Sequence, residues 1–283
     1  MTQDRHDVRF EWGQAGAAAL APSSSCLVVV DVLSFSTSVT VAVEAGTRVY
    51  PYAWRDESAV SFARSHRARL AVGRRAASAD QPWSLSPAAL RRAPFAPRLV
   101  LPSPNGSAIC AAAAVAAGAS AAAGAGAGVA AGAGAGVSVV AGCLRNAAAV
   151  GRYLRERRSL GPVAVIAAGE RWPDGSLRPA LEDLLGAGAI LAALRGADAG
   201  AASSGAGSPG VVLSPEADAA RACFEGTADV AAAVAGSVSG RELVDGGFGD
   251  DVAIAVETDA CGLVPVLSSD GAFDPPNGQH RMP

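Results

Sequence analysis

The chain has 283 residues, a net charge of −3 and no lysine, because all 23 of its basic residues are arginine. Lysine-based chemistry is therefore excluded, and without a cationic run we expect neither nucleic acid nor a membrane surface as a partner. The five cysteines lack CxxC spacing, which argues against a metal cluster or a disulfide framework, and the polar N-terminus without a signal-type apolar stretch favours a cytoplasmic location.

Short β-branched runs and helical stretches alternate along the first part of the chain. Strands are expected at 8–10, 27–33, 47–52, 69–73 and 98–103, and helices at 36–46 and 56–66. Continuous apolar strands that alternate with helices are typical of a mostly parallel sheet covered on both faces. Residues 1–110 are therefore interpreted as an N-terminal α/β half.

Residues 111–136 are almost entirely alanine and glycine and carry no charge. They do not predict a membrane-spanning helix, because glycine costs about 1 kcal/mol relative to alanine in a helix and the flanks lack aromatic and basic anchors. We expect a helix over about 107–117, followed by a flexible insertion. Residues 119–136 should be poorly packed and dispensable.

The alternation resumes after this insertion. Strands are expected at 137–142, 163–169 and 263–268, and helices at 146–158, 179–195, 215–236 and 250–260, with a Gly/Ser-rich linker at 196–210. Residues 137–270 are thus a C-terminal α/β half, and 271–283 have the composition of a disordered tail. The predicted fold is a three-layer α/β/α arrangement with a largely parallel or mixed sheet in two halves.

Carboxylates, hydroxyls, amides and arginines remain as candidates for chemistry. The three histidines lie near the N-terminus, at the end of an Arg-rich helix and in the tail, so histidine-based catalysis is not expected. The remaining side chains are those used in magnesium-assisted phosphoryl chemistry.

The segment VVVDVLSFSTSV offers the first candidate site. Its apolar strand delivers Asp31 to the carboxyl end of the predicted sheet, where open α/β sheets bind ligands. Ser36 and Thr37 follow at the start of a helix, where hydroxyl and backbone N–H groups can hold an anion, although the same residues would serve as an ordinary helix cap. A haloacid-dehalogenase site is excluded, because it needs a second aspartate at the position of Leu33.

The segment LPSPNGSA (101–108) is the second candidate. Asn105 and Gly106 predict a turn after a strand, and Ser107 can cap the helix that follows. Most Asn-Gly pairs are simple turns, so this segment indicates a functional site only in combination with the other candidate segments.

Two acidic segments follow in the second half. Residues 168–188 contain four acids and two arginines within 14 residues, and place Glu182 and Asp183 in the first turn of a helix, where the dipole alone would also favour them. The segment GFGDDVAIAVETD (247–259) offers Asp250 as a cap. It also places Asp251 and Asp259 near one face of a helix.

Taken in this order, the segments resemble the 2-phosphosulfolactate phosphatase family, magnesium-dependent acid phosphatases associated with coenzyme M biosynthesis. The family pattern has DVLRATTT, TTNGT, a strand followed by Asn, AG…G…LED, and a late GFxxD with a further Asp before VP. Between about residues 26 and 268 this chain has DVLSFSTS, SPNGS, AGCLRN, AGERWPDGSLRPALEDLLGAGAI, GFGDDVAIAVETD and VPVL. The positions that fit are Asp31, Asn105, Gly106, Asn146, Gly175, Glu182, Asp183, Asp251 and Asp259. The pattern's arginine after DVL is Ser34 here.

The resemblance implies a Mg²⁺-dependent hydrolase of a small acidic phosphate monoester, with 2-phosphosulfolactate as the first candidate. The expected metal ligands are Asp31, Glu182, Asp183 and Asp251, and Asp31 is also the candidate catalytic residue, as nucleophile or general base. The expected substrate contacts are Ser36, Thr37, Asn105, Gly106, Ser107, Asn146 and Arg178, the last facing a second anionic group in place of the missing arginine. Two alternatives stay open: a hydrolase or phosphotransferase that acts on another phosphorylated carboxylic acid, and a catalytically silent protein that binds an anion. A homo-oligomer is also possible from the sequence.

Overall fold

A computed structural model describes residues 3–53, 56–116, 137–196 and 211–274 of the chain. Within these residues the main sheet has nine strands, in the order β1-β7-β2-β6-β10-β11-β3-β5-β4. Their bounds are β1 Val8–Trp12, β2 Cys26–Val30, β3 Arg48–Tyr52, β4 Arg69–Leu70, β5 Arg98–Pro102, β6 Ser138–Gly142, β7 Val163–Ala167, β10 Val266–Leu267 and β11 Phe273–Asp274. A separate two-stranded hairpin joins β8 (Glu170–Arg171) to β9 (Leu177–Arg178).

The sheet combines two parallel groups through an antiparallel hairpin. Strands β1, β7, β2 and β6 pair in parallel, as do β3, β5 and β4. Between them, β10 pairs antiparallel with β6, and β11 pairs antiparallel with both β10 and β3. The prediction of an α/β fold with a largely parallel or mixed sheet is confirmed. Because β2 lies between β7 and β6, strands from before and after the Ala/Gly insertion share one sheet rather than forming separate ones.

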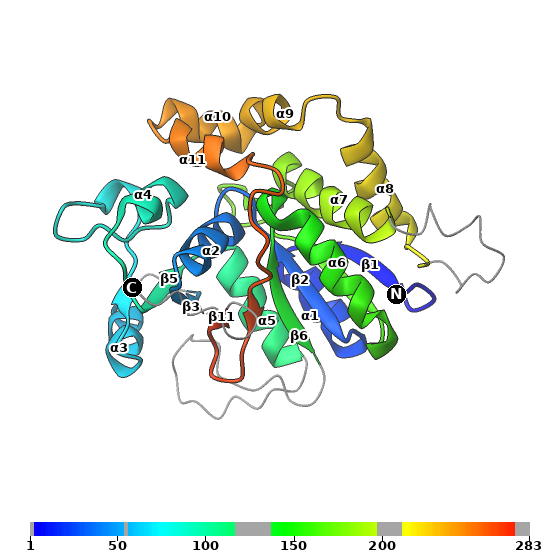
Figure 1. Ribbon diagram of the computed structural model, residues 1–283, viewed down its shortest axis with the longest axis horizontal. Helices are drawn as coiled ribbons and strands as arrows, with labels where there is room; N and C mark the ends of the chain where they lie inside the picture. The colour runs from blue at the N-terminus through cyan, green and yellow to red at the C-terminus, as the bar shows by residue number, and fades with distance from the viewer. Residues whose placement is uncertain (1–2, 54–55, 117–136, 197–210, 275–283) are drawn as a thin grey trace.

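Helices flank both faces of the sheet (Figure 1). Their bounds are α1 Gly13–Leu20, α2 Phe35–Glu44, α3 Glu57–Ser65, α4 Pro87–Arg92, α5 Gly106–Ala116, α6 Ala147–Arg157, α7 Leu181–Arg195, α8 Pro215–Gly226, α9 Val230–Gly236, α10 Val238–Asp245 and α11 Gly249–Ala255. Alternate residues of β2 serve the two faces. Val28 and Val30 join the core formed with α6, α7 and α8, whereas Leu27 and Val29 join the core formed with α1, α2 and α5.

Two predicted elements differ in the structure for local reasons. The helix expected over 215–236 is divided into α8 and α9, because the side chain of Asp229 accepts a hydrogen bond from the Ala232 N–H and starts a new helix. Phe273–Asp274, which lie within the predicted disordered tail 271–283, form strand β11. Phe273 is fully buried within β11, where its apolar ring completes the core next to β3.

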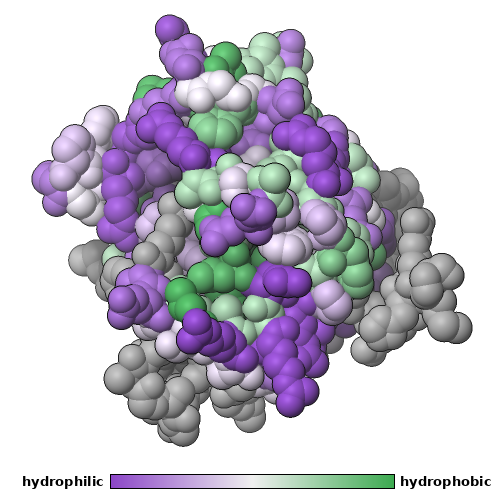
Figure 2. Space-filling view, turned by 90° about the vertical axis from the view of Figure 1, so that its left-hand side faces the viewer, coloured by the Kyte–Doolittle hydropathy of each residue, from purple (hydrophilic) through white to green (hydrophobic). Residues whose placement is uncertain are grey.

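Some expectations fall on residues that the structure does not describe. The predicted helix before the insertion is present as α5, but the dispensable segment 119–136, most of the linker 196–210 and the tail after Asp274 lie outside the described residues. No helix among those described is both long and apolar enough to cross a membrane. The face shown in Figure 2 is predominantly hydrophilic with smaller hydrophobic areas, as is usual where side chains meet water.

Candidate active site

Asp31 lies directly after β2 and joins two helix N-termini. Its Oδ1 accepts a hydrogen bond from the Phe35 N–H at 2.9 Å, and its Oδ2 accepts one from the Gly106 N–H at 3.0 Å. A Cβ atom at Gly106 would collide with the Phe35 ring and lie 2.9 Å from Asp31 Oδ2, so only glycine allows this approach. The carboxylate therefore fixes the ends of β2 and β5 relative to each other.

The first turn of α7 brings two more carboxylates to the same place. Asp183 Oδ1 accepts from the Val32 N–H at 2.7 Å and Oδ2 from the Gly169 N–H at 2.8 Å, which ties together the chain segments that leave β2 and β7. Its neighbour Glu182 is 1% exposed, and Glu182 Oε2 is buried with no hydrogen-bond partner among the described residues. A buried carboxylate oxygen without a partner is costly unless a proton or cation accompanies it.

Burial and the neighbouring charges shift the pKa values of Asp31 and Asp183. Burial raises the pKa of Asp31, while the Phe35 and Gly106 N–H groups and the Arg74 charge oppose the rise. Burial also raises the pKa of Asp183 well above its ordinary value, and the negative charges of Asp31 and Glu182 raise it further. The cluster therefore favours the uptake of positive charge.

Glu170, in β8, extends this cluster toward solvent. Asn105 Nδ2 donates a hydrogen bond to Glu170 Oε2 at 2.9 Å. Burial, and then the negative charge of Asp31, raise the pKa of Glu170 to about 7, against the stabilising hydrogen bond from Asn105. Glu170 lines two cavities, of about 400 Å³ and about 180 Å³. It is the acid of this cluster that two cavities reach.

Arg74 also lines the larger cavity. It lies in the short 3₁₀ helix Arg74–Ala76, and its Nε donates to Asp251 Oδ2 at 2.9 Å while Nη2 donates to the Ser34 hydroxyl. The second oxygen of Asp251 accepts from the Ser86 hydroxyl at 2.5 Å and the Ala88 N–H at 3.1 Å. Asp251 is 1% exposed and has both oxygens engaged, so its visible task is to hold Arg74 and the start of α4.

The carboxylates of this cluster would bind Mg²⁺ only together with water molecules. No three His, Cys, Asp or Glu side chains among the described residues are grouped so as to hold a metal ion by themselves. Mg²⁺, however, commonly uses one or two carboxylates and keeps several waters. The unpartnered oxygen of Glu182, beside Asp31 and Asp183 in a cluster with excess negative charge, fits that mode of binding.

Comparison with known families adds the decisive observation. The family model described as 2-phosphosulpholactate phosphatase matches residues 121–270 of this chain. The protein belongs to the 2-phosphosulpholactate phosphatase family. No curated protein matches the chain at a significant level.

The family match covers part of the candidate site. Glu170, Glu182, Asp183 and Asp251 lie within the matched residues, whereas Asp31 and the 101–108 segment precede them. The hydrogen bonds of Asp31 to Gly106 and of Asp183 to the Val32 N–H connect these two portions of the family member into one site.

Several predicted substrate contacts of this family member support the backbone in the structure. The hydroxyls of Ser36, Thr37 and Ser107 donate to the carbonyl oxygens of Val29, Val32 and Leu101 at 2.9, 2.8 and 3.1 Å. Asn146 Nδ2 donates to two carbonyl oxygens, those of Ala141 and Leu263, at 3.2 Å each, and Oδ1 accepts from the Cys143 N–H at 2.9 Å. All four side chains are fully buried, which leaves the Asn146 amide hydrogens no capacity for a ligand.

Arg178 lies opposite Glu170 in the β8–β9 hairpin. Its guanidinium pairs with Glu242 of α10 at 3.2 Å and lies 5.7 Å from the centre of the Trp172 ring. Its charge also lowers the pKa of Glu170. Arg178 therefore lies near the cluster, and its guanidinium forms an ion pair with Glu242. Asp174 does not pair with Arg178 but accepts hydrogen bonds from Ser176.

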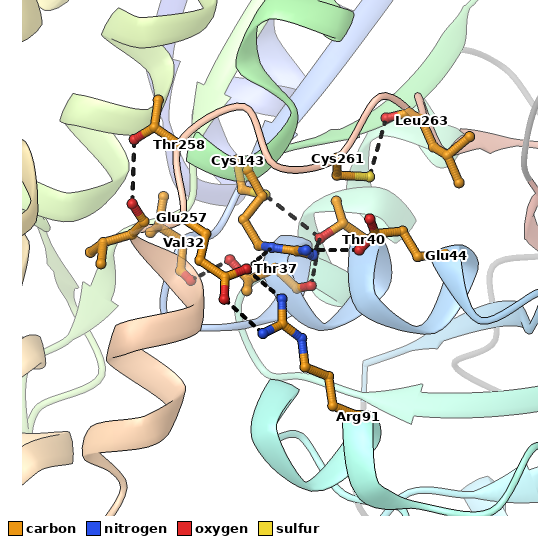
Figure 3. Close-up of polar contacts among 12 residues, drawn as sticks. Val32, Thr37, Thr40, Glu44, Arg91, Cys143, Glu257, Thr258, Cys261 and Leu263 are labelled. Carbon is orange, nitrogen blue, oxygen red and sulfur yellow. Dashed lines mark hydrogen bonds and ion pairs between the residues drawn. The ribbon is translucent and has the colours of Figure 1, made fainter.

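A second charge network is centred on the buried Arg145. Arg145, with a side chain 3% exposed, pairs with Glu44 at 2.8 Å and Glu257 at 3.2 Å and donates to the Thr40 hydroxyl at 3.0 Å. Figure 3 shows Glu257 reaching toward Arg91 of α4, with Thr40 and Glu44 approaching from α2. The network connects α2, α4 and the segment after α11.

Sequence reasoning gave no site role to Glu170 or Arg74. Glu170 belongs to the acid-rich loop after a predicted strand, and Arg74 follows Gly73 directly after another. Position after a strand is the signal that both share. Local sequence could not show that the two side chains reach one cavity.

Proposed function

We propose that this protein is a Mg²⁺-dependent phosphatase that hydrolyses a small acidic phosphate monoester, with 2-phosphosulfolactate as the first candidate substrate. The observation that carries the proposal is the cluster of Asp31, Glu170, Glu182 and Asp183 beside a cavity of about 400 Å³. That volume suits a small organic ligand. Family membership supports phosphate-ester chemistry at this place.

The residues have separate tasks in the proposed reaction. Water displaces the alcohol at phosphorus, so the ester P–O bond breaks and the alcohol leaves with a proton. Glu170 reaches the cavity and can give that proton, since its pKa lies near neutrality. Asp31, oriented by two N–H groups, and Glu182, with its unpartnered oxygen, would hold the metal ion. Bound Mg²⁺ would supply a Lewis acid that stabilises charge on the phosphoryl oxygens.

The acidic surroundings argue against anion binding without catalysis. Four carboxylates would repel a phosphate group unless a cation or protons offset their charge. The substitution of Ser34 for the pattern's arginine favours one further candidate, a phosphorylated carboxylic acid without a sulfonate. Both candidates share the phosphate ester and the second acidic group.

Phosphate release tests the proposal directly. Purified protein would be incubated with 2-phosphosulfolactate, 2-phospholactate and isopropyl phosphate, with Mg²⁺ or with EDTA. We expect release from the acidic esters with Mg²⁺, loss with EDTA and recovery on adding Mg²⁺ back. The absence of release from every ester in the presence of Mg²⁺ would contradict the proposal.

Glu182→Gln gives a matched test of the metal site. It removes one charge but keeps the size of the side chain, and it should lower Mg²⁺ affinity together with kcat. Because a ligand that binds the folded state raises its stability, Mg²⁺ should raise the Tm of the wild type more than that of the variant. Asp250→Asn, at an exposed neighbour of Asp251, is the control and should respond like the wild type. Equal Tm shifts in all three proteins would remove Glu182 from the metal site.

A further inference from the structure

We infer that Arg74 and the cavity that it lines receive the second, non-phosphate anionic group of the substrate, next to position 34, where the family pattern has an arginine and this chain has Ser34. This inference rests on the proposed phosphatase function. It assigns specificity to a residue forty positions away in the sequence from the missing one.

The contact between Arg74 and Ser34 carries the first step. Arg74 Nη2 donates to the hydroxyl of Ser34, so the guanidinium occupies the space next to the residue that lacks a cationic side chain. An arginine at position 34 and one at position 74 would thus serve the same region.

The tether of Arg74 leaves donors for a ligand. A guanidinium has five N–H donors in a fixed plane. Nε is bound to Asp251 and one Nη2 hydrogen to Ser34, while Nη1 has no hydrogen-bond partner among the described residues. The side chain is 19% exposed and lines the cavity of about 400 Å³. A guanidinium whose Nε and Nη2 are bound, and whose Nη1 can still donate, is suited to bind a carboxylate or sulfonate.

Arg75 adds a second cation to the same wall. It is exposed, lines the cavity next to Gly73 and Arg74, and pairs with no acid in the described parts of the chain. Glu170 lies on the lining of the same cavity and Asn105 binds Glu170. The cavity thus offers a proton donor for the ester oxygen and two cations for an anion elsewhere on the substrate.

Arg178 is the competing candidate for this task. Its guanidinium is paired with Glu242, which itself lines the cavity, and Arg178 is absent from the residues that line it. Arg74 is also paired, but with a buried acid that fixes its position rather than with an exposed one. The geometry therefore favours Arg74.

Two substrates with one carbon skeleton isolate the second anion. 2-Phospholactate and isopropyl phosphate carry the phosphate on the same kind of carbon, and only the former has a carboxylate. The selectivity ratio is kcat/KM for 2-phospholactate divided by that for isopropyl phosphate. Removing a charge-assisted hydrogen bond should lower this ratio by about tenfold or more.

Arg74→Gln alone would leave Asp251 buried without its cation, so a double variant, Arg74→Gln with Asp251→Asn, keeps that pair neutral. Ser34→Arg with Arg74→Ser moves the arginine back to the family position and should recover part of the ratio relative to Arg74→Ser alone. Arg92→Gln, at an exposed pair with Asp250, is the control and should leave the ratio unchanged. Tm and far-UV circular dichroism would verify folding of each variant.

The outcomes separate the two proposals. If the wild type with Mg²⁺ releases phosphate from none of 2-phosphosulfolactate, 2-phospholactate and isopropyl phosphate, the phosphatase function fails. If it hydrolyses 2-phospholactate and isopropyl phosphate and the double variant lowers both equally, or neither, the function stands and the assignment to Arg74 is overturned. A lowered ratio in the double variant, with recovery in the Ser34→Arg swap, supports the inference.

Discussion

Glu170 is half-buried and lines two cavities, and its surroundings set the pKa of its carboxyl group. Burial and the charge of Asp31 favour the protonated form, and Asn105 holds one oxygen in place. With a pKa of about 7, the group changes protonation where many intracellular enzymes work. A carboxylic acid that still carries its proton near neutral pH can protonate a poor leaving group.

The pH dependence of turnover should therefore follow Glu170. Only the protonated form donates, so kcat for isopropyl phosphate should fall as pH rises through about 7. Glu170→Gln should lower kcat by about 10²–10⁴-fold and remove this limb. An aryl ester such as p-nitrophenyl phosphate, whose leaving group needs no proton, should depend much less on Glu170.

The measurement is kcat against pH from about 5 to about 9 for both esters. Asp174→Asn, in the same hairpin but exposed and bound to Ser176, is the matched control. Persistence of the same pH limb in Glu170→Gln would assign the titration to another group.

The type of a residue and its place in the sequence could not show which of the candidate side chains contribute to the site. Asp31, Glu182 and Asp183 were predicted to share one site, because strand ends and a helix N-terminus can be located from sequence. In the structure the charges of Asp31 and Glu182 act on Asp183, and a shared metal site stays a prediction. The interaction of Arg74 with Ser34 and Asp251 connects segments far apart in the chain, and no local pattern encodes it. The hydroxyls of Ser36 and Thr37 stand where an anion could be held, but their contacts with carbonyl oxygens depend on the packed backbone.

At the scale of elements, the short strand β11 is tied to the site through aromatic packing. Phe273 is fully buried, and its ring contacts that of Phe35 at a centroid distance of 6.2 Å. Phe35 in turn supplies the N–H that orients Asp31 and packs against Gly106. Arg48 of β3 also binds Asp274 at 2.6 Å, so β11 is fastened by charge as well as by packing.

Phe273→Ala should therefore destabilise the protein by about 3–5 kcal/mol, as expected for removal of a buried aromatic ring. Urea unfolding would give the change. Phe95→Ala, which removes a ring that is 64% exposed, should change stability by less than about 0.5 kcal/mol. Similar small losses in both variants would show that β11 is peripheral to the folded core.

Most strands and helices were predictable because apolar runs of four to five residues alternate with longer helical stretches. Several of the elements that were not predicted lack such a signal, whereas α4 begins with Ser86 and Pro87, which are typical of a helix start. Helix α1 is rich in alanine and glycine and begins without a capping side chain, and α10 follows α9 after a single residue, Ser237, which caps it. Strand β11 has only two residues, so partners rather than its own sequence define it.

At the scale of the whole molecule, the strand order places segments from before and after the Ala/Gly insertion in one sheet. The Ala/Gly insertion suggested two halves, but β1 and β2 pair with β7 and β6 from beyond it. Strand order depends on which edges meet in three dimensions, and alternation along the chain does not specify it. The family pattern was recognisable nevertheless, because its motifs lie at strand ends in a fixed order.

One continuous sheet predicts one cooperative unfolding transition. Trp12 ends β1 at one edge of the sheet, and Trp83 stacks with Arg69 of β4 at the other. Variants that keep only one of these tryptophans should give coincident urea unfolding curves by fluorescence, which also match far-UV circular dichroism. Separate midpoints at the two edges would indicate two units that unfold independently.

The central position of β2 has a consequence for how the chain is made in the cell. Its CLVVV segment leaves the ribosome long before its two neighbours, whose paired residues begin at Ser138 and Val163. At about 5–20 residues per second of synthesis, the strand waits on the order of ten seconds with both edges open. An apolar strand with unpaired edges is a template for association with other chains. Production of this protein should consequently depend on chaperones that bind nascent polypeptides, and slower translation of the intervening segment would lengthen the exposure.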